Sequence, residues 1–510
     1  MGEDIAPTRR GGRRRRNDKP ERVVDYRRLR HPFSPQTVFT AEEVVRLHDT
    51  ALRVLEELGI RILLPEARAL FAAAGARVED EMVFIGRDIV AGALETAPTS
   101  VMLRAPNPAR EQVYAEGSLI FAPGGGCPNA TDRVRGRRPG SIADFQEVIK
   151  LTQSFDVVHV LGPSVEPQDV PVAVRHYATT RAQVGLSDKP VSIYARGRGQ
   201  VEDCFAMIRL AHGLSEDQFT DGAWVKTVIN SNSPRMIDRP MAEGLIDFAR
   251  AGQLTIVTPF CLAGAMAPVT VAGALTLQHA EALAGITLAQ LARAGAPVSY
   301  GGFSSNVDMR SGAPAFGTPE HLKMQMGAGQ LARHIGLPWR SAAGAASNTA
   351  DMQAATETDM GLWGAMMANA TMTLHAAGWL EGGLSFGYEK FINDVEALQT
   401  LAELCAPVSG EADEIGFDAL AEVAPGGHFF ATAHTMARYD TAFYAPLVAD
   451  LSNHGSWEEA GSQTAAERAT AIWQRTLADF SPPPGAEAAA ARIDDFIARR
   501  KAEGGALPME

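Results

Sequence analysis

Three residues near position 380 have the types and spacing needed to bind a positively charged ligand. Residues 374–383 read Leu-His-Ala-Ala-Gly-Trp-Leu-Glu-Gly-Gly and contain His375, Trp379 and Glu381. An aromatic ring beside a carboxylate holds a quaternary ammonium group by cation–π attraction and by opposite charge. In the alternative interpretation Trp379 belongs to the core and Glu381 caps a helix, and the spacing alone does not separate the two.

Segments rich in glycine, asparagine and serine are a second group of candidate binding residues. They occupy residues 124–132, 230–234, 301–308 and 345–351. Such segments let a ligand approach the backbone closely. None matches a P-loop or a dinucleotide-binding fingerprint, so tight turns are the simpler interpretation of each.

Metal and thiol chemistry have weaker support. The sequence has no HExxH or CxxC motif and no paired histidines at zinc-ligand spacing. His428 and His434 could ligate a metal, but their spacing is unspecific. Cys127 and Cys261 are candidate thiolate nucleophiles or ligands, although buried, inert cysteine is the commoner case. We therefore expect no metal site.

The composition indicates a large acidic protein of the soluble, cytoplasmic class. The 510 residues are 46% hydrophobic and have a formal net charge of −13. One large domain with additions explains this length better than several small domains. No apolar run reaches the roughly 18 residues of a membrane span. The four widely spaced cysteines indicate free thiols and a reducing compartment.

The N-terminal residues 1–36 differ in charge from the rest and are expected to form a disordered basic tail. Residues 1–30 contain 11 Lys or Arg against 5 Asp or Glu, so the remaining chain has a formal charge of −19. Solvated disorder is the common state of such a segment. The acidic body argues against nucleic-acid binding, and no apolar region completes an export signal after the arginines.

Eight short apolar runs position the candidate residues. They start about 30 to 45 residues apart, and each is followed by a helix-like stretch. Strand–helix alternation repeated eight times predicts an α/β fold, a (β/α)8 TIM barrel, with function on the loops after the strands. The runs cover residues 118–123, 157–162, 191–196, 225–230, 255–260, 298–303, 339–344 and 371–378.

Two further parts flank the predicted barrel, which spans residues 117–410. Residues 37–116 predict a small N-terminal α+β module, in which Thr40 and Glu43 form a capping box and Gly59 ends the first helix. A helix at 394–404 closes the barrel. Residues 411–510 predict a C-terminal helical extension, whose last helix we expect on the outside of the barrel or on another subunit.

Several separate motifs resemble the trimethylamine methyltransferase family of corrinoid-dependent methyltransferases. They are Gly-Trp-Leu-Glu-Gly-Gly-Leu-Ser-Phe-Gly-Tyr-Glu at 378–389, residues 348–353, residues 427–435 and the N-terminal module ending in Ala-Pro-Thr-Ser at 97–100. The likeness extends from about residue 40 to residue 477. The archaeal trimethylamine enzymes of this family carry pyrrolysine, which is absent here. Members without it include enzymes that act on glycine betaine and related quaternary amines, so the resemblance implies a betaine-like substrate in preference to trimethylamine.

The implied reaction moves one methyl group from a quaternary amine to Co(I) of a corrinoid (cobalamin) held by a separate protein. The enzyme itself would bind no cofactor permanently. Because cobalt is the nucleophile, the barrel must align the N–CH3 bond with the metal and exclude water.

Loop position and residue type then suggest a role for each candidate. His375 is a polar positioning group in the catalytic centre. The aromatic residues expected to face the ammonium group are Trp379, Phe303, Tyr300 and Tyr388. The carboxylates expected to offset its charge are Glu381, Asp351 and Asp308. The donors available to a substrate carboxylate are Arg310, Asn348 and the backbone amides of residues 124–126.

Other functions stay open on the sequence alone. An aldolase or a metal-assisted hydrolase would need a Schiff-base lysine or clustered ligands at the strand ends, where lysine is scarce. A non-catalytic amine-binding protein on the same barrel is a further alternative. We expect a homo-oligomer, because barrels of this size commonly associate.

Overall fold

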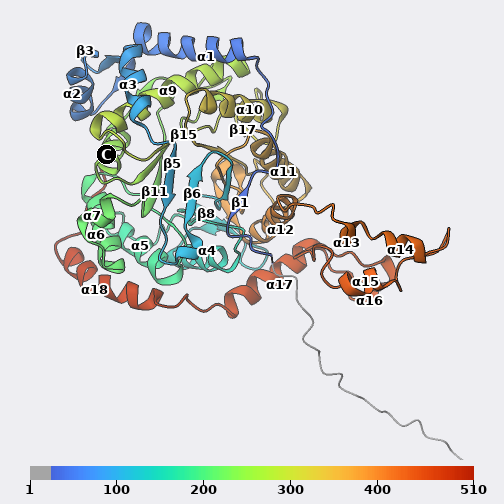
Figure 1. Ribbon diagram of the computed structural model, residues 1–510. Helices are drawn as coiled ribbons and strands as arrows, with labels where there is room; N and C mark the ends of the chain where they lie inside the picture. Colours follow the sequence, from blue (N-terminus) through green and yellow to red (C-terminus); the bar gives the residue numbers. More distant parts are fainter. Residues whose placement is uncertain (1–23, 510) are drawn as a thin grey trace, which may run out of the picture. The chain divides into compact units, whose positions relative to one another are not determined.

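The computed structural model describes residues 24–509 and contains a central eight-stranded sheet (Figure 1). Neighbouring strands follow the order β1-β7-β19-β18-β15-β13-β11-β10. All pairs are parallel except β1 with β7. The strands are β1 (Leu29–Arg30), β7 (Ser118–Phe121), β10 (Val191–Ser192), β11 (Val225–Ile229), β13 (Leu254–Val257), β15 (Val298–Gly301), β18 (Trp339–Ala342) and β19 (Met372–Leu374).

The seven parallel strands coincide with seven of the eight predicted runs. Every residue of β7, β13, β15 and β18 is buried, because side chains cover both faces of the sheet. Strand β1 lies within the segment expected to be a basic tail, and the backbone amide of His31 extends its pairing by donating to the carbonyl of Gly117 at 3.0 Å. The first 23 residues of that predicted tail lie outside the described residues.

The predicted strand at 157–162 is not a strand in the structure. The segment nevertheless lies beside both ends of the parallel series of strands, since the His159 amide donates to the Phe121 carbonyl of β7 at 2.9 Å and the Leu161 amide to the Pro190 carbonyl before β10 at 3.0 Å. The Phe121 amide donates instead to the His159 Nδ1 atom at 2.8 Å. A side-chain acceptor thus replaces a backbone carbonyl, which interrupts the regular strand ladder.

Helices follow the strands and surround the sheet, as Figure 1 shows. A capping box of Ser141 and Asp144 opens α4. The closing helix α12 begins at Tyr388, six residues before its predicted start at 394, so Tyr388 and Glu389 are helical. The eight helices are α4 (Ile142–Ser154), α5 (Arg175–Leu186), α6 (Arg198–His212), α8 (Arg239–Arg250), α9 (Val271–Ala292), α10 (Pro319–His334), α11 (Met352–Met367) and α12 (Tyr388–Leu404).

The N-terminal part contains helices and short strands. Its elements are α1 (Ala41–Arg53), continued by a π-helical turn at Val54–Leu58, then β2 (Ile60–Ile62), α2 (Pro65–Ala73), β3 (Arg77–Glu79), β4 (Met82–Phe84), α3 (Arg87–Thr96), β5 (Ser100–Leu103) and β6 (Gln112–Ala115). Helix α1 has the predicted capping box of Thr40 and Glu43. Helices α1 and α3 pack on α9 (Figure 1).

The hairpin β5–β6 covers the amino ends of the parallel strands. Leu103 and Tyr114 pack in one apolar cluster with Ile256 and Met372 from the sheet. The Tyr114 hydroxyl also forms a 2.8 Å hydrogen bond with Ser299 of β15. With these ends covered by the hairpin, a ligand would approach the sheet from the carboxyl ends of its parallel strands.

The C-terminal part falls into two compact regions. Pro407–Ala445, with α13 (Ala412–Ile415), α14 (Phe417–Glu422) and α15 (Ala433–Arg438), belongs to a unit separate from that of Tyr26–Ala406 and the chain from Pro446 onward. In the larger unit, α16 (His454–Glu459) is followed by α17 (Ala465–Ala478), which packs on α12 and α4, and by α18 (Ala486–Ala502), which packs on α5 and α6.

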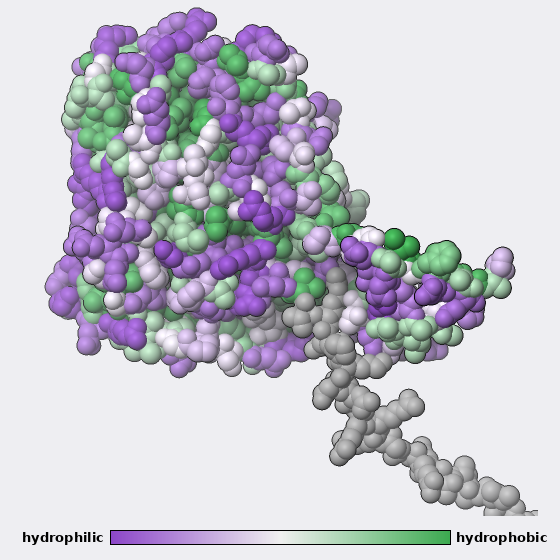
Figure 2. Space-filling model, in the orientation of Figure 1, coloured by the Kyte–Doolittle hydropathy of each residue, from purple (hydrophilic) through white to green (hydrophobic). Residues whose placement is uncertain are grey.

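Hydrophilic side chains predominate on the molecular face drawn in Figure 2, with apolar groups scattered among them. Within residues 24–509 no helix is both long enough and apolar enough to cross a membrane.

Candidate active site

A cavity of about 310 Å³ lies at the carboxyl ends of the parallel strands. Ligands of parallel α/β proteins bind at this end, on the loops that follow the strands. The lining residues come from β10, β11, β18 and β19, from the short strand β20 (Trp379–Leu380), and from loops that follow the parallel strands. They are Gly125, Gly126, Pro163, Ser192, Ile193, Tyr194, Lys226, Thr227, Val228, Asn230, Thr258, Phe260, Phe303, Arg340, Leu374, His375, Trp379, Gly382 and Gly383.

Trp379 and His375 form one aromatic wall of the cavity. Their rings stack with centroids 4.4 Å apart and an interplanar angle of 23°. Trp379 opens β20 (Trp379–Leu380), is 4% exposed, and donates its indole N–H to the Gly125 carbonyl at 3.3 Å. The structure therefore brings these two predicted residues together at the cavity and holds the indole in one orientation.

Glycines make room for the indole. A Cβ atom on Gly344 would lie 2.3 Å from the Trp379 Cε3 atom, and a Cβ atom on Gly383 would lie 2.6 Å from its Cζ2 atom. Both glycines have φ above +100°, where a side chain is also strained. Gly344, which directly precedes the segment at 345–351, and Gly383, four residues after Trp379, therefore leave the space that this ring occupies.

His375 offers a hydrogen-bond donor without a positive charge. Its backbone φ is +56°, an uncommon value for a residue with a side chain, and one that is enriched at functional sites. Burial, with a contribution from Arg340, lowers the pKa of His375 well below its ordinary value. Nδ1 accepts the Gly125 amide at 3.2 Å, so in the neutral ring the proton resides on Nε2.

Phe303 extends the aromatic wall. Its ring centroid lies 5.1 Å from that of His375 and 4.9 Å from that of Phe260. Tyr194 is 47% exposed at the rim, and its hydroxyl accepts a 2.9 Å hydrogen bond from Arg196. Sequence reasoning missed Phe260 and Tyr194, because each looked like an ordinary member of its apolar run, 255–260 or 191–196.

Lys226 and Arg340 are the charged residues of the cavity lining, and sequence reasoning missed both. They are 0% and 1% exposed. Within the described chain, the Lys226 Nζ atom and the Arg340 Nε and Nη1 atoms have no hydrogen-bond partner. Burial lowers the pKa of Lys226 to about 7, with a contribution from Arg340, and lowers the pKa of Arg340 to about 9. The sequence does contain a sign of both residues, namely a cation inside an otherwise apolar or uncharged strand. The two strands read Val-Lys-Thr-Val-Ile and Trp-Arg-Ser-Ala.

The three predicted carboxylates do not line the cavity. Glu381 forms a 3.0 Å ion pair with Arg137. Asp351 is the exposed N-cap of α11 and accepts the Ala354 amide at 3.2 Å. Asp308 is exposed and accepts hydrogen bonds from the Ser311 amide and hydroxyl. Each carboxylate is thus held by partners at its own position, and the structure does not bring the three together at the cavity.

The predicted carboxylate donors are also placed differently. Arg310 and Asn348 are exposed and lie outside the cavity lining. The amides of residues 124–126 are already used, because they donate to the Ala377 carbonyl, to His375 Nδ1 and to the Pro163 carbonyl, respectively. These amides therefore shape the loop and are not open to an anion.

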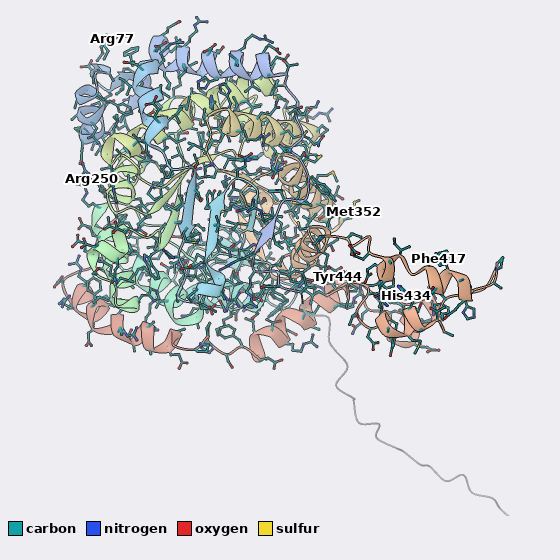
Figure 3. All side chains as sticks on the ribbon, viewed as in Figure 1. Arg77, Arg250, Met352, Phe417, His434 and Tyr444 are labelled. Atoms are coloured by element: carbon teal, nitrogen blue, oxygen red, sulfur yellow. The ribbon has the colours of Figure 1, made fainter. Side chains whose placement is uncertain are left out.

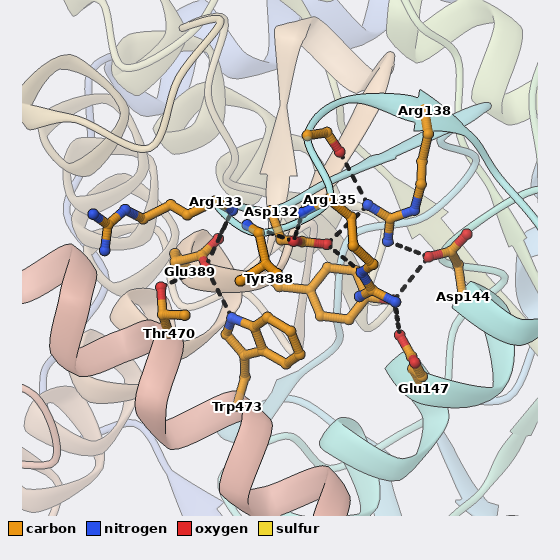
Figure 4. Close-up of polar contacts among 12 residues, drawn as sticks. Asp132, Arg133, Arg135, Arg138, Asp144, Glu147, Tyr388, Glu389, Thr470 and Trp473 are labelled. Atoms are coloured by element: carbon orange, nitrogen blue, oxygen red, sulfur yellow. Dashed lines mark hydrogen bonds and ion pairs between the residues drawn. The ribbon is translucent and has the colours of Figure 1, made fainter.

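Tyr300 and Tyr388 lie away from the cavity. The buried Tyr300 hydroxyl accepts a 3.0 Å hydrogen bond from Gln278 of α9. The Tyr388 hydroxyl donates to Glu147 at 2.6 Å, and its ring receives the Arg135 guanidinium at 4.8 Å (Figure 4). Both tyrosines support helix contacts, and neither belongs to the cavity lining.

The described residues give no support to thiol or metal chemistry. Cys127 and Cys261 are buried free thiols, and burial raises the pKa of each, which disfavours a reactive thiolate. His434, labelled on α15 in Figure 3, contacts the Asp413 carbonyl at 3.1 Å. Among residues 24–509 no group of three or more His, Cys, Asp or Glu side chains is arranged to hold a metal ion.

Known proteins resemble this chain over nearly its whole length. The family model "Trimethylamine methyltransferase (MTTB)" matches residues 8–505. A glycine betaine methyltransferase of Desulfitobacterium hafniense (strain Y51) is 34% identical, covering 92% of this chain and 98% of the relative.

Two further relatives have lower sequence identity. A trimethylamine methyltransferase MttB of Desulfitobacterium hafniense (strain DSM 10664 / DCB-2) is 27% identical over 92% of this chain and 94% of its own. A proline betaine:corrinoid methyltransferase of Eubacterium limosum is 28% identical over 76% of this chain and 82% of its own. With a family model that spans almost all of its residues, the chain belongs to the trimethylamine methyltransferase family.

Proposed function

We propose that the protein transfers a methyl group from a quaternary or tertiary amine, such as a glycine betaine-like compound or trimethylamine, to Co(I) of a corrinoid protein. The observation that carries this proposal is the cavity whose wall is formed by Trp379, His375, Phe303 and Phe260. Aromatic rings bind methylated ammonium groups through their negative faces and their apolar surface. The relatives with betaine and trimethylamine in their names support the same chemistry.

The corrinoid, when bound on its partner protein, supplies the nucleophilic cobalt that takes the methyl group. In this proposal the cavity of about 310 Å³ receives the amine, and the corrinoid of the partner protein approaches its open side from outside. Exposed Tyr194 and the glycines at 382 and 383 border this approach.

The residues of this chain bind, orient and desolvate the amine. Buried Trp379 and Phe303 exclude water from the reacting C–N bond. The neutral His375 adds no positive charge next to the ammonium group, and its Nε2–H can position a polar part of the substrate. Fixed aromatic rings thereby provide orientation, which is the main contribution an enzyme can make when the nucleophile comes from a partner.

We infer that the central sheet closes into a (β/α)8 barrel. Support comes from segment 157–162, which hydrogen-bonds to the chain at both β7 and β10 and so connects the two edges of the parallel strands. A closed barrel would explain why the cavity is reached from one end. A homo-oligomer and a cytoplasmic location are further parts of this proposal, the latter supported by the four free cysteines.

The proposal is tested with the purified protein, chemically reduced cobalamin and a panel of glycine betaine, choline, carnitine, proline betaine and trimethylamine. We expect at least one amine to convert cob(I)alamin to methylcobalamin, followed by its absorption spectrum, and demethylated product to appear in equal amount. Binding of an amine without any methyl transfer, either to free cobalamin or to the corrinoid protein of the same organism, would support a non-catalytic amine-binding protein instead.

A further inference from the structure

Lys226 and Arg340 lack the counter-ions that buried cations normally have. Both line the cavity, and none of its described lining residues is acidic. Within the described chain, the Nζ atom of Lys226 has no hydrogen-bond partner, and neither do the Nε and Nη1 atoms of Arg340. An isolated charge away from water is strongly unfavourable unless a partner or a ligand compensates it. An anionic ligand would therefore supply the counter-charge that the two side chains lack.

Other buried lysines of the same fold are satisfied, which makes the contrast informative. Lys189 donates to three backbone carbonyl groups, and Lys390 forms an ion pair with Asp394. Both are as buried as Lys226. The fold thus supplies partners to its structural lysines and leaves Lys226 and Arg340 free at the cavity.

The two cations lie deeper than the aromatic wall. Arg340 pairs in register with Gly301, two residues before Phe303. Lys226 pairs in register with Leu254, which lies four residues before the lining residue Thr258 on the same segment. In parallel strands, later residues are closer to the carboxyl ends, so the cation layer lies towards the end that the β5–β6 hairpin covers.

We propose that Lys226 and Arg340 form an anion subsite that binds the carboxylate of the substrate, so the enzyme selects quaternary amines that bear a carboxylate. This inference rests on the function proposed above. Charge-assisted hydrogen bonds from ammonium and guanidinium groups are the strongest available to a carboxylate. The buried Thr258 hydroxyl, also without a partner in the described chain, is a further donor on the same lining.

This orientation also serves the reaction. With the carboxylate on the deep cations, the methylated nitrogen lies towards Phe303, Phe260 and Trp379 and towards the mouth. The methyl groups then face the side from which a partner-held corrinoid arrives. Repulsion by Lys226 and Arg340 keeps the ammonium end out of the deep position, so the two ends of the substrate cannot exchange places.

The test compares four ligands in isothermal titration calorimetry with the full-length protein. Glycine betaine and choline both contain a trimethylammonium group, but only the former has a carboxylate. Tert-butylacetic acid and its alcohol are their carbon isosteres, in which a tert-butyl group replaces the trimethylammonium group. We expect each carboxylate to bind at least about tenfold more tightly than its alcohol, as expected for hydrogen bonds between charged groups.

Two variants and a control locate the effect. Lys226→Met and Arg340→Met should each reduce the preference for carboxylate over alcohol by about tenfold, while the Kd for choline changes by less than about twofold. Arg181→Gln is the control, because it removes a cation whose partner, Asp494, lies with it on the exposed surface of α5 and α18. It should leave all four affinities unchanged.

The results separate this inference from the proposed function. A carboxylate preference that is absent in the wild-type protein, or that persists in both methionine variants, overturns the anion subsite even if methyl transfer occurs. A preference that depends on Lys226, together with no methyl transfer from any amine, supports the subsite and overturns the function.

Melting temperatures check folding, and Lys226→Met should melt no lower than the wild type without ligand, since it removes an uncompensated buried charge. A clearly lower value would indicate a structural lysine and would contradict the inference.

Discussion

The guanidinium carbon of Arg340 lies 4.8 Å from the centre of the Phe303 ring. This contact joins the deep cations to the aromatic wall, because Phe303 also lies 5.8 Å from Trp379 in an edge-to-face arrangement. A desolvated cation–π contact of this kind is worth about 2 kcal/mol and offsets part of the cost of burying Arg340. It also means that Arg340 already uses a face of Phe303, so an ammonium ligand must rely more on Trp379 and Phe260.

The stability of the ligand-free protein should depend on pH through Lys226. Its pKa is about 7 in the folded protein, whereas an ordinary lysine has 10.5. Between these values the unfolded chain binds a proton that the folded chain does not, so folding stability rises as pH increases from 7 towards 10.5. The full effect is on the order of 5 kcal/mol. Melting temperatures of the wild type and Lys226→Met at both ends of this range should show the rise in the wild type relative to the variant, and parallel pH curves would contradict it.

Carboxylate binding should weaken as pH rises. Lys226 is protonated below its pKa of about 7 and neutral above it, whereas Arg340, with a pKa of about 9, keeps its charge longer and His375 stays uncharged. The Kd for glycine betaine should therefore increase from about pH 6 to about pH 8.5, by roughly tenfold. Calorimetry in buffers of different ionisation enthalpy should also detect proton uptake on binding near pH 8. Lys226→Met should show neither effect, and a flat profile for the wild type would contradict the prediction.

Replacing Gly344 should disturb the seat of Trp379. In Gly344→Ala the new methyl group would meet the indole at 2.3 Å, in addition to the strain of φ +102°. Gly295→Ala is a matched control, because Gly295 has φ +78° and nothing within 4 Å of the added Cβ atom. We expect the control to lose about 1 kcal/mol of folding stability and Gly344→Ala to lose about 3 kcal/mol. Only Gly344→Ala should also bind amines more weakly. Equal effects of the two substitutions would contradict the prediction, because they would show that the indole of Trp379 moves to accommodate the added methyl group.

Removing the charge of Glu381 should have little effect on amine binding. Its partner Arg137 is 51% exposed, and a pair of this kind contributes less than about 1 kcal/mol. Glu381→Gln and Arg137→Gln break the same pair, so both should change the Kd for a quaternary amine by less than about twofold. A large loss of affinity in Glu381→Gln alone would mean that this carboxylate reaches the ammonium group.

Much of the fold could be predicted from local patterns along the chain. Strands buried on both faces appear as continuous apolar runs, and seven of the eight runs are strands in the structure. The exception, at 157–162, depends on the side chain of His159 accepting the Phe121 amide, which no apolar pattern reports. His375 and Trp379 were found because they are close in sequence and lie at the end of the last strand.

The remaining features of the site arise only when distant segments meet. Lys226 and Arg340 are more than a hundred residues apart, and each alone is a single cation in an apolar strand. Strand register and the direction in which each side chain points place both in one cavity, without an acidic partner. Asp308, Asp351 and Glu381 look suitable by residue type, but nearby donors bind their carboxylates. Residue type and periodicity are local properties, whereas the charge balance of a cavity is a sum over all the elements that surround it, and only the tertiary structure decides that sum.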